Sequence, residues 1–407
     1  MSGKIVKVSG PVVGIAGLPG AKMGDVVYLG VNRVAGEVTQ LTKDTVWVLA
    51  CETASGLTPG DPAVCAGSPL TMELGPGLLG GAYDGLGRSL EALYAKSGDM
   101  VTPGIEVQTL DRTKRWRFHP SVTVGAKLTA GDVIGMVQET ASVMHKIMVP
   151  GGLSGTVAEI HSGERTVDEV VAILKAADGA DHKLTMAQTW AIRRERPYKQ
   201  KHRSETHLQT GVPEIDQSAS PLVLGGTALL IGEDDSGQAM LKQLIAGAEI
   251  DVIVYVACGL SGGTCAEIIQ ICSEQAEPKT VLVTSPCDTE AIMREATIHR
   301  GMTIASYYRD MGLHAVLVID NLVAWFNAVS EVAGLMGEST HELGLPINLS
   351  SRLAELFAPA GFVTCQGTEK RQGSLSIIGN PLSEDASETM EHMLTRLIPT
   401  VWRMEND

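Results

Sequence analysis

Between residues 225 and 380, short apolar runs alternate regularly with longer stretches of helical periodicity. The runs are TALLI, DVIVYVA, KTVLVTS and HAVLVID. Runs that are apolar at every position are typical of strands covered on both faces, and helices between the strands supply the cover. The pattern therefore predicts an α/β unit with a largely parallel sheet. One of its helices is expected over DTEAIMREATIHRG, with Asp288 as its N-cap and Gly301 at its end.

The chain before and after this unit has a different character. Residues 1–68 are short apolar stretches broken by turn signals, which favours a small β-barrel. Residues 105–185 also carry strand signals, and the capping-box spacing of Thr166 and Glu169 predicts a short helix there. We expect a multidomain chain with these segments: an N-terminal β-barrel (1–68), a connector and start of the core with a helix near 88–96 (69–104), a mostly β insert (105–185), the α/β core (186–380) and a short helical tail (381–407).

The charge balance limits the partners of such a chain. It has 407 residues, with 32 basic and 47 acidic side chains and a net charge of −15, which argues against a general nucleic-acid surface. No apolar run approaches the ~20 residues of a membrane span, so we expect no direct membrane insertion. The basic stretch RRERPYKQKHR (193–203) is interpreted as a connector or an ion-paired interface.

The cysteines indicate reduced thiols. There are seven of them and no CxxC pair, which favours neither a disulfide framework nor a zinc site. Cys258, Cys265 and Cys272 recur every seven residues and are interpreted as small apolar residues near a helix face, with redox or metal chemistry as the alternative.

The first turn between strand and helix in the core has the skeleton of a phosphate-binding loop. In the pattern G-x-x-x-x-G-K-[ST], the two glycines cradle phosphate, the lysine contacts the β- and γ-phosphates, and the hydroxyl binds Mg²⁺. The corresponding residues here are Gly232, Glu233, Asp234, Asp235, Ser236, Gly237, Gln238 and Ala239. The glycine spacing is kept, but Gln238 has no charge and Ala239 has no hydroxyl.

The three acidic residues of this loop stand where phosphate would lie. Like charges in such a place oppose the binding of an anion. The helix N-terminus that follows still favours a negative group, so one hypothesis is that a carboxylate of the loop occupies the phosphate position. The alternative is an ordinary surface turn with solvated acids. Asp320 ends the run HAVLVID, where a Walker B aspartate would hold Mg²⁺ through water.

Five longer segments carry a family resemblance. They are ELGPGLLGGAYDGLGRSL (73–90), HKIMVPGGLSGTVAEIHSGERTV (145–167), LTMAQTWAIRRERPY (184–198), REATIHRGMTIASYYRDMG (294–312) and LSSRLAELFAPAG (349–361). With them the chain resembles, over nearly its whole length, the catalytic A subunit (alpha chain) of the V/A-type (vacuolar/archaeal) rotary ATPases. The resemblance implies an N-terminal β-barrel, the bulge insert of A subunits, a RecA-like nucleotide core and a C-terminal helical domain.

The same resemblance implies an activity and partners. It implies ATP and Mg²⁺ as cofactors, a cytoplasmic ring of A and B-like subunits around a central stalk, and transport of protons or sodium ions through a membrane sector. The chain would then be cytoplasmic and peripheral to a membrane complex. The tail after residue 380 is short compared with the family's C-terminal helical domain, which we expect to be largely absent.

The departures from the family pattern fall on the chemistry. The family loop GPFGSGKT corresponds to GEDDSGQA (232–239), the glutamate that polarises water corresponds to Leu260, and a family arginine corresponds to Ala324. Asp320 and Arg352 are retained. Leucine cannot orient or deprotonate water. We therefore expect a catalytically inactive A-subunit-like protein, structural, regulatory or protein-binding, in which ATP and Mg²⁺ bind weakly or not at all.

Two alternatives remain open at this point. The first is a working ATP-hydrolysing or ATP-synthesising subunit, in which Lys242, one helical turn after Gln238, supplies the missing cation. The second is a nucleotide- or anion-binding sensor without turnover.

Overall fold

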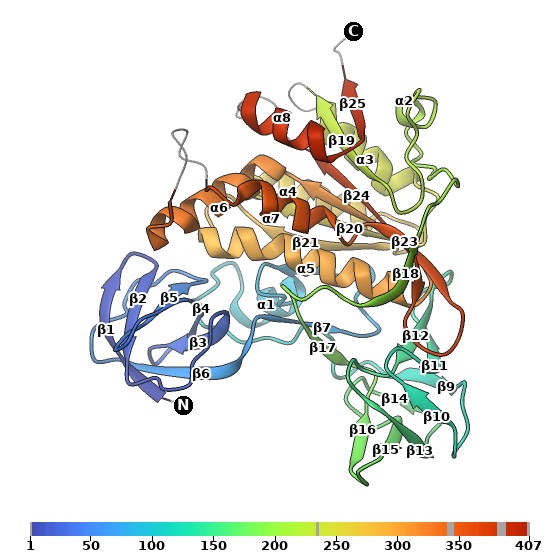
Figure 1. The fold of residues 1–407 in the computed structure, drawn as a ribbon, viewed down its shortest axis with the longest axis horizontal. Coiled ribbons are helices and arrows are strands. Elements are labelled where there is room, and N and C mark those ends of the chain that lie inside the picture. The colour runs from blue at the N-terminus through green and yellow to red at the C-terminus, as the bar shows by residue number, and fades with distance from the viewer. Residues whose placement is uncertain (1, 233–235, 340–345, 381–387, 405–407) are drawn as a thin grey trace.

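The computed structural model describes residues 2–232, 236–339, 346–380 and 388–404. Figure 1 shows the N-terminal barrel and the insert at opposite ends of the core. In this described part of the chain, no helix combines the length and the apolar character needed to cross a membrane.

The N-terminal segment is a closed six-stranded barrel, as predicted. Its strands pair in the order β1-β2-β5-β4-β3-β6. Inward-facing residues such as Ile5, Val13, Ile15 and Val48 fill it with an apolar core of its own. The bounds of the strands are β1 (Ser2–Ser9), β2 (Val12–Ala16), β3 (Asp25–Leu29), β4 (Val34–Leu41), β5 (Val46–Ala50) and β6 (Pro62–Pro69).

The connector contributes two strands and one helix. Strand β7 (Thr71–Leu74) pairs with β17 (Gln188–Ala191), and β8 (Ala82–Asp84) joins the edge of the core sheet. Helix α1 (Leu90–Ser97) begins where the sequence predicts a helix, because the Ser89 hydroxyl accepts a hydrogen bond from the Ala92 N–H at 3.4 Å.

The insert is β-rich, with two four-stranded sheets in the orders β10-β13-β15-β16 and β12-β11-β9-β14. Its strands are β9 (Trp116–Pro120), β10 (Lys127–Thr129), β11 (Val133–Gln138), β12 (Met144–Met148), β13 (Ser154–Ile160), β14 (Gly163–Arg165), β15 (Ala172–Lys175) and β16 (Asp181–Leu184).

The short helix predicted after Thr166 is wrong. The Thr166 N–H does donate to Glu169 Oε2, at 2.7 Å, but this bond only closes a turn. The following residues form β15, which pairs with β13 on one side and β16 on the other. Tertiary pairing on both edges, together with burial of Ala172 and Leu174, outweighs the local capping signal.

A buried polar cluster attaches the insert to the core. His145 of β12 contacts Glu139 Oε2 through Nδ1 at 2.6 Å and the Tyr307 hydroxyl through Nε2 at 2.9 Å. Glu139 also accepts a hydrogen bond from the Gly77 N–H of the connector at 2.7 Å. The insert is therefore joined to both the connector and the core by groups that solvent does not reach.

The core is a nine-stranded sheet in the order β18-β23-β24-β22-β20-β21-β8, with β19 between β24 and β25. Strands β19 to β22, β24, β25 and β8 pair in parallel, whereas β18-β23 and β23-β24 are antiparallel. The largely parallel sheet is confirmed. The strand bounds are β18 (Tyr198–His202), β19 (Thr227–Gly232), β20 (Val252–Cys258), β21 (Thr280–Ser285), β22 (His314–Asp320), β23 (Gly361–Cys365), β24 (Gln372–Asn380) and β25 (Thr400–Met404).

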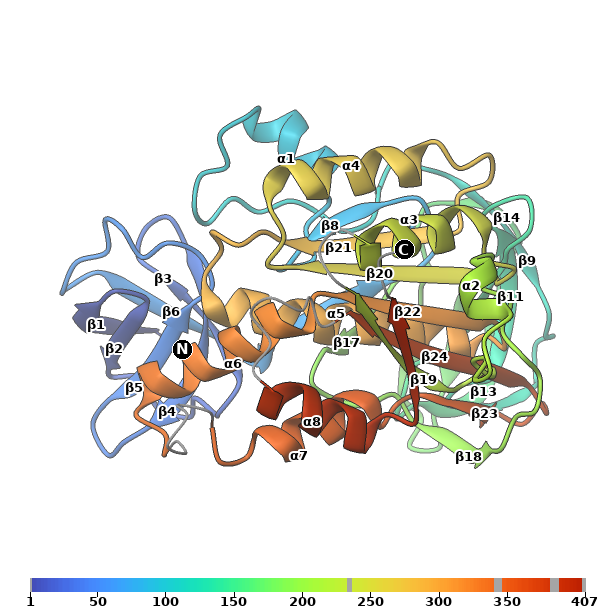
Figure 2. The ribbon, with the colours of Figure 1, turned by 90° about the horizontal axis from the view of Figure 1, so that it is seen from above.

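Helices cover both faces of this sheet (Figure 2). Alternate strand residues divide between two apolar clusters, Val254 with the α5 side and Tyr255 with the α3 side for example. This explains why the strands are apolar at every position. The helices are α2 (Pro213–Asp216), α3 (Ser236–Gly247), α4 (Gly262–Ser273), α5 (Ala291–Asp310), α6 (Leu322–Met336), α7 (Leu349–Phe357) and α8 (Glu388–Leu397).

Helix α5 differs from its prediction at both ends. Its N-cap is Glu290 rather than Asp288, and it continues through Gly301 to Asp310. Gly301 faces the sheet, where a methyl group in place of its hydrogen would overlap Cγ2 of Val256. The glycine therefore permits close packing of helix on sheet and does not end the helix.

The tail after residue 380 is only partly helical. Helix α8 is present, but residues Thr400–Met404 form β25, which pairs in parallel with β19. The prediction of a purely helical tail is corrected in this respect. The apolar run in PTVWRM adds a strand to the core sheet, with Trp402 buried.

Candidate functional site

The carboxyl ends of the parallel strands meet at one edge of the core sheet. The residues that end these strands are Gly232 in β19, Cys258 in β20, Ser285 in β21, Asp320 in β22 and Asn380 in β24. Ligands of open α/β sheets bind at this edge. The same edge therefore holds the candidate site.

Asp320 lies at the centre of a buried hydrogen-bond cluster. Its Oδ2 accepts from the Tyr255 hydroxyl at 2.6 Å and from Gln238 Nε2 at 3.3 Å. Its Oδ1 accepts from Asn380 Nδ2 at 2.9 Å. Burial raises the pKa of Asp320, and these three hydrogen bonds oppose that rise. Each carboxylate oxygen thus already accepts at least one hydrogen bond from the protein itself, and three of the roughly four acceptor positions of the carboxylate are used.

The cluster also perturbs Tyr255. Burial, followed by the charge of Asp320 and the hydrogen bond to it, raises the pKa of the Tyr255 hydroxyl well above its ordinary value. The hydroxyl therefore stays protonated at neutral pH and acts as a donor to the aspartate.

The phosphate-binding loop is described only in part. Glu233, Asp234 and Asp235 lie outside the described residues, so the hypothesis that one of them occupies the phosphate position stays a prediction. Ser236 begins α3, and Ala239 on the same helix is exposed. Gly237 is buried and lies next to Asn380. A methyl group in place of its hydrogen would lie 3.2 Å from Asn380 Oδ1.

Leu260 and Ala324 are the positions that the resemblance aligns with a family glutamate and a family arginine. Leu260 lies in the loop after β20, and Ala324 lies in the first turn of α6. Leu260 is only 5% exposed and packs in the apolar cluster on the α3 side of the sheet. A methyl group on the adjacent Gly259 would overlap Cβ of Ala324. The structure therefore places the two substituted positions beside each other, with apolar groups at both.

Backbone hydrogen bonds join the loops that follow three of the strands. The Gly259 N–H donates to the Ser285 carbonyl at 2.7 Å, and the Cys287 N–H donates to the Leu260 carbonyl at 3.1 Å. The Asn321 N–H donates to the Cys258 carbonyl at 3.1 Å. These bonds fix the loops relative to one another and hold Leu260 against the core.

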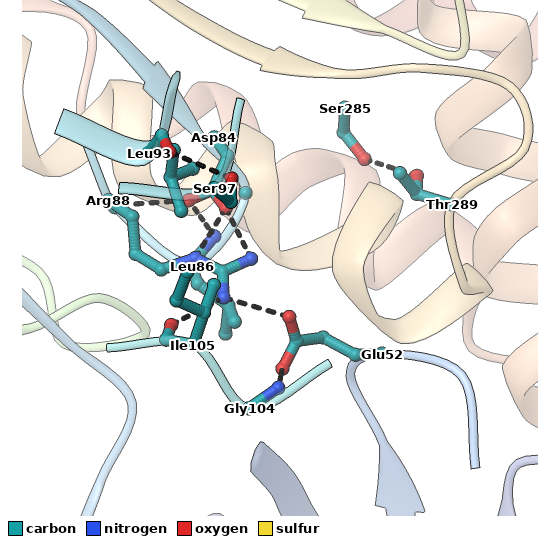
Figure 3. Close-up of polar contacts among 12 residues, drawn as sticks. Glu52, Asp84, Leu86, Arg88, Leu93, Ser97, Gly104, Ile105, Ser285 and Thr289 are labelled. Atoms are coloured by element: carbon teal, nitrogen blue, oxygen red, sulfur yellow. Dashed lines mark hydrogen bonds and ion pairs between the residues drawn. The ribbon is translucent and has the colours of Figure 1, made fainter. Parts of the chain in front are cut away.

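The same edge continues past β21 to β8. Figure 3 shows Ser285, hydrogen-bonded to Thr289 at 2.7 Å, together with Asp84 at the end of β8. Arg88 lies between two carboxylates, with 2.7 Å from Nη2 to Asp84 Oδ2 and 2.8 Å from Nη1 to Glu52 Oε1. Glu52 belongs to the segment after β5, so this network also joins the barrel to the sheet edge.

Arg352 does not belong to the Asp320 cluster. It lies on α7 and pairs with Glu338 Oε2 at 3.2 Å. It lines a cavity of about 640 Å³ between the barrel and helices α5 to α7. Among the residues that the structure describes, Arg352 has no hydrogen bond or ion pair with Gln238 or Asp320.

Lys242, the candidate for a substitute cation, points to a different helix. Its Nζ lies 2.8 Å from Glu267 Oε2 of α4. The glutamate is largely exposed, so this is a surface ion pair.

The basic stretch 193–203 contains an ion-paired interface, one of the two interpretations offered for it. Arg193 bridges Glu37 Oε2 of the barrel at 2.9 Å and Glu295 Oε2 of α5 at 2.6 Å. Arg196 pairs with Asp310 Oδ2 at 2.7 Å. Although burial alone would lower it, the pKa of Arg193 is raised well above its ordinary value by the two glutamates.

The thiols near the site are protonated at neutral pH. Burial raises the pKa of Cys258 to about 12 and that of Cys272 to about 11, and also raises that of Cys265. Thiolates are the reactive form of cysteine. The interpretation of the three residues as small packing groups agrees with these shifts, but the interpretation that they lie near a helix face is wrong for Cys258. Cys258 ends strand β20, whereas Cys265 and Cys272 lie on α4, so the seven-residue spacing does not place them on one helix.

Two members of the Asp320 cluster were not singled out from the sequence. Tyr255 lies inside the apolar run DVIVYVA, and Asn380 ends the run SLSIIGN. The position of Asn380 at the end of a core strand was a usable signal, because it repeats that of Asp320. No comparable signal marked Tyr255 in the sequence, because tyrosine is common in strands.

Three family models match successive parts of the chain. The model described as the ATP synthase alpha/beta family beta-barrel domain matches residues 5–67. The alpha/beta subunit barrel-sandwich domain matches residues 107–193, and the nucleotide-binding domain of the same family matches residues 211–401.

Relatives in bacteria and archaea are similar over the whole chain. A V-type ATP synthase alpha chain of Thermoanaerobacter sp. (strain X514) is 40% identical over 416 residues, covering 100% of this chain and 70% of the relative. A protein of the same description from Clostridioides difficile (strain 630) is 40% identical, with coverage of 99% and 70%. The A-type ATP synthase A chain of Methanopyrus kandleri is 39% identical, with coverage of 100% and 70%.

Proposed function

Because the chain belongs to the ATP synthase alpha/beta family, among the relatives of V- and A-type catalytic A subunits, we propose that it is an A-subunit-like protein that does not hydrolyse ATP. Its role is structural or regulatory, within a V/A-type complex or as a scaffold that binds other proteins. The observation that carries this proposal is the set of hydrogen bonds around Asp320.

An aspartate that holds Mg²⁺ through water must accept hydrogen bonds from the waters of the ion. Tyr255 and Gln238 already donate to one oxygen of Asp320, and Asn380 donates to the other. Ala239 has no hydroxyl to complete the shell of the ion. These donors do not fit a resident Mg²⁺, and no catalytic step is derived through one.

The other groups of the site also support the absence of ATP hydrolysis. Gln238 offers a neutral amide where a lysine would neutralise phosphate charge, and its amide is engaged with Asp320. Buried Leu260 cannot orient a water molecule. Loss of the phosphate clamp, the water-orienting base and the metal ligand removes three contributions that are each worth orders of magnitude in rate.

Two other functions compete with this proposal. A working catalytic chain would need Lys242 to leave Glu267, which a surface ion pair permits at little cost in free energy. A nucleotide or anion sensor without turnover would use the retained glycine spacing and the N-terminus of α3.

The family suggests the setting of the protein. We place it in the cytoplasm, peripheral to a membrane complex, with B-like subunits and the central stalk as candidate partners. ATP and Mg²⁺ bind weakly or not at all in this proposal.

The test is a calorimetric titration of the full chain with ATP and with ADP, each with and without Mg²⁺, alongside a phosphate-release assay. The alpha chain of the Thermoanaerobacter relative serves as the positive control. We expect neither binding nor phosphate release at millimolar nucleotide. Pull-down with the chains of a V/A-type complex then identifies the partner.

Each alternative has its own signature in this experiment. Micromolar binding without phosphate release would replace the scaffold by the sensor. Phosphate release that disappears in the Lys242→Ala variant would overturn the proposal in favour of the working catalytic chain.

A further inference from the structure

A second site of unusual charge lies away from the Asp320 cluster, around Arg300 of α5. This arginine is only 1% exposed. Its Nε donates to the Gly85 carbonyl, and its Nη1 donates to the Thr71 carbonyl at 2.7 Å. None of the carboxylates that the structure describes forms an ion pair with it. A buried guanidinium held only by backbone carbonyls is rare, because buried charges are generally paired.

The electrostatic state of Arg300 reflects this lack of a partner. Burial lowers the pKa of its guanidinium to about 10, and the charge of Asp84 is the strongest opposing influence. Asp84 itself is committed to another residue, since its oxygens accept hydrogen bonds from Arg88 Nε at 2.7 Å and from the N–H groups of Leu86 and Arg88. Arg300 therefore remains a cation without a dedicated counter-ion.

Arg300 lines a cavity between the barrel and the connector. The cavity has a volume of about 210 Å³. Its charged walls are Arg33, Arg88, Arg300, Glu52 and Glu106. Asp84, which pairs with Arg88, lies beside the lining, so three carboxylates balance three arginines in number.

Both glutamates of the lining are already paired. Glu52 Oε1 lies 2.8 Å from Arg88 Nη1, and its Oε2 accepts from the Gly104 N–H at 2.9 Å, as Figure 3 shows. Glu106 Oε1 lies 3.1 Å from Arg33 Nε. Among the arginines of the lining, Arg300 is therefore the one for which the described residues provide no ion pair.

The position of the cavity in the fold also favours a ligand. Asp84 ends β8, which runs parallel to β21, and Arg88 follows one turn later. The cavity thus lies beyond the carboxyl end of an edge strand, where the barrel closes over it. Crevices in this position are the usual ligand sites of α/β sheets.

We propose that the cavity lined by Arg300, Arg88 and Arg33 binds a small oxyanion, namely the carboxylate or phosphate group of a compact molecule. The anion supplies the counter-charge that Arg300 lacks. The site is independent of nucleotide chemistry at Asp320 and of the outcome of the experiment on ATP.

The first test is a calorimetric titration of the full chain with inorganic phosphate and, separately, with succinate. Binding of either anion, at about one per chain, supports the proposal, and the stronger of the two identifies the class of anion. In crystals of the same chain soaked with selenate, the anomalous signal of selenium is expected in the cavity beside Arg300. No binding of any of the three anions would overturn the proposal.

The variant Arg300→Met tests the residue that carries the argument. It keeps much of the length of the side chain and removes the charge, and we expect anion affinity to fall at least tenfold while the far-UV circular dichroism is unchanged. Arg115→Met is the matched control, because Arg115 is a half-exposed arginine of the insert outside the cavity, and it should leave affinity unchanged. Unchanged affinity in a folded Arg300→Met chain would sink the idea. If that variant does not fold, the selenate position in the unmodified chain decides.

Discussion

Nε2 of Gln238 on α3 lies 3.3 Å from Oδ2 of Asp320 on β22. This contact joins the residue that the resemblance aligns with the family's lysine to the residue that it aligns with the metal-binding aspartate. The amide that replaces the lysine is turned toward the carboxylate inside the protein, and both residues are buried. The two positions that would contact phosphate and metal thus stabilise each other.

Removing the strongest donor to Asp320 should weaken this cluster. In Tyr255→Phe, the carboxylate loses a hydrogen bond of 2.6 Å and remains buried. Unfolding in urea should show a loss of about 1–3 kcal/mol. Tyr94→Phe is the control, since Tyr94 is an exposed tyrosine of α1. Equal stability of both variants would mean that the hydroxyl contributes nothing net.

Restoring the family's glutamate at Leu260 should not restore catalysis. The side chain is buried among apolar residues, so Leu260→Glu places a carboxylate without partners in the core. We expect a loss of stability on the order of 3 kcal/mol and no phosphate release from ATP. Urea unfolding and the phosphate-release assay check the two statements. Phosphate release by this single variant would contradict the proposal that the site is inactive.

Gly301 should resist replacement although alanine is the better helix former. Alanine in the middle of a helix gains about 1 kcal/mol over glycine. In Gly301→Ala the new methyl group overlaps Val256, and overpacking costs about 1–3 kcal/mol, so the net effect is destabilising. Gly334→Ala on α6 is the matched control, because nothing lies within 4 Å of the added methyl group, and it should be stabilising. Thermal melting of both variants measures the difference in sign.

The Arg193 bridge should dominate the attachment of the barrel. Arg193→Met leaves Glu37 and Glu295 buried without their common partner. Breaking a fully buried ion pair from one side costs about 3–5 kcal/mol, and because the Arg193 side chain is 34% exposed we expect a loss at or below the low end of that range. The control is Arg33→Met, because Arg33 is half exposed and its pair with Glu106 is at the surface. A loss no larger than that of the control would show that solvent screens the bridge.

The same bridge predicts how stability depends on pH. Burial alone would raise the pKa of Glu295, but the attraction of Arg193 and the hydrogen bonds of His299 and Arg193 outweigh burial and lower it far below its ordinary value of 4.5. A carboxyl with a lowered pKa contributes stability above its ordinary pKa, and the contribution disappears as the pH falls toward the lowered value. Urea midpoints of the unmodified chain should therefore fall below about pH 4.5 more steeply than those of Glu295→Gln. Parallel slopes would contradict this.

The core sheet could be predicted well from the sequence, because several strands each carry the same pattern of apolar residues at successive positions. Val252 to Cys258 is apolar at every position, and each such strand lies between two others in the core. The capping spacing at Thr166 and the glycine at 301 misled because both are local signals. Their outcome depends on strands distant in the chain, which pairing and packing bring together.

The candidate site is predictable only where strand ends carry polar residues. Asp320 follows directly from its position. The donors to its carboxylate come from three other elements, and only the folded register brings Tyr255, Asn380 and Gln238 to one point. Arg300 could not be predicted from the sequence either. Nothing in the sequence of a helix indicates that an arginine on it will be buried and hydrogen-bonded to backbone carbonyl groups.

The pairing of β25 with β19 has a consequence for biosynthesis. Val401 is paired with Leu229, more than 170 positions earlier in the chain. Ribosomes deliver the N-terminal part first, at about 5–20 residues per second. β19 therefore waits on the order of ten seconds or more for β25, and its other edge stays open almost as long because its partner β24 is also synthesised late. The barrel, whose strands all lie within residues 2–69, can already close during this time. During that interval the nascent chain exposes the unpaired edges of an apolar strand, which is the kind of surface that favours aggregation before folding is complete.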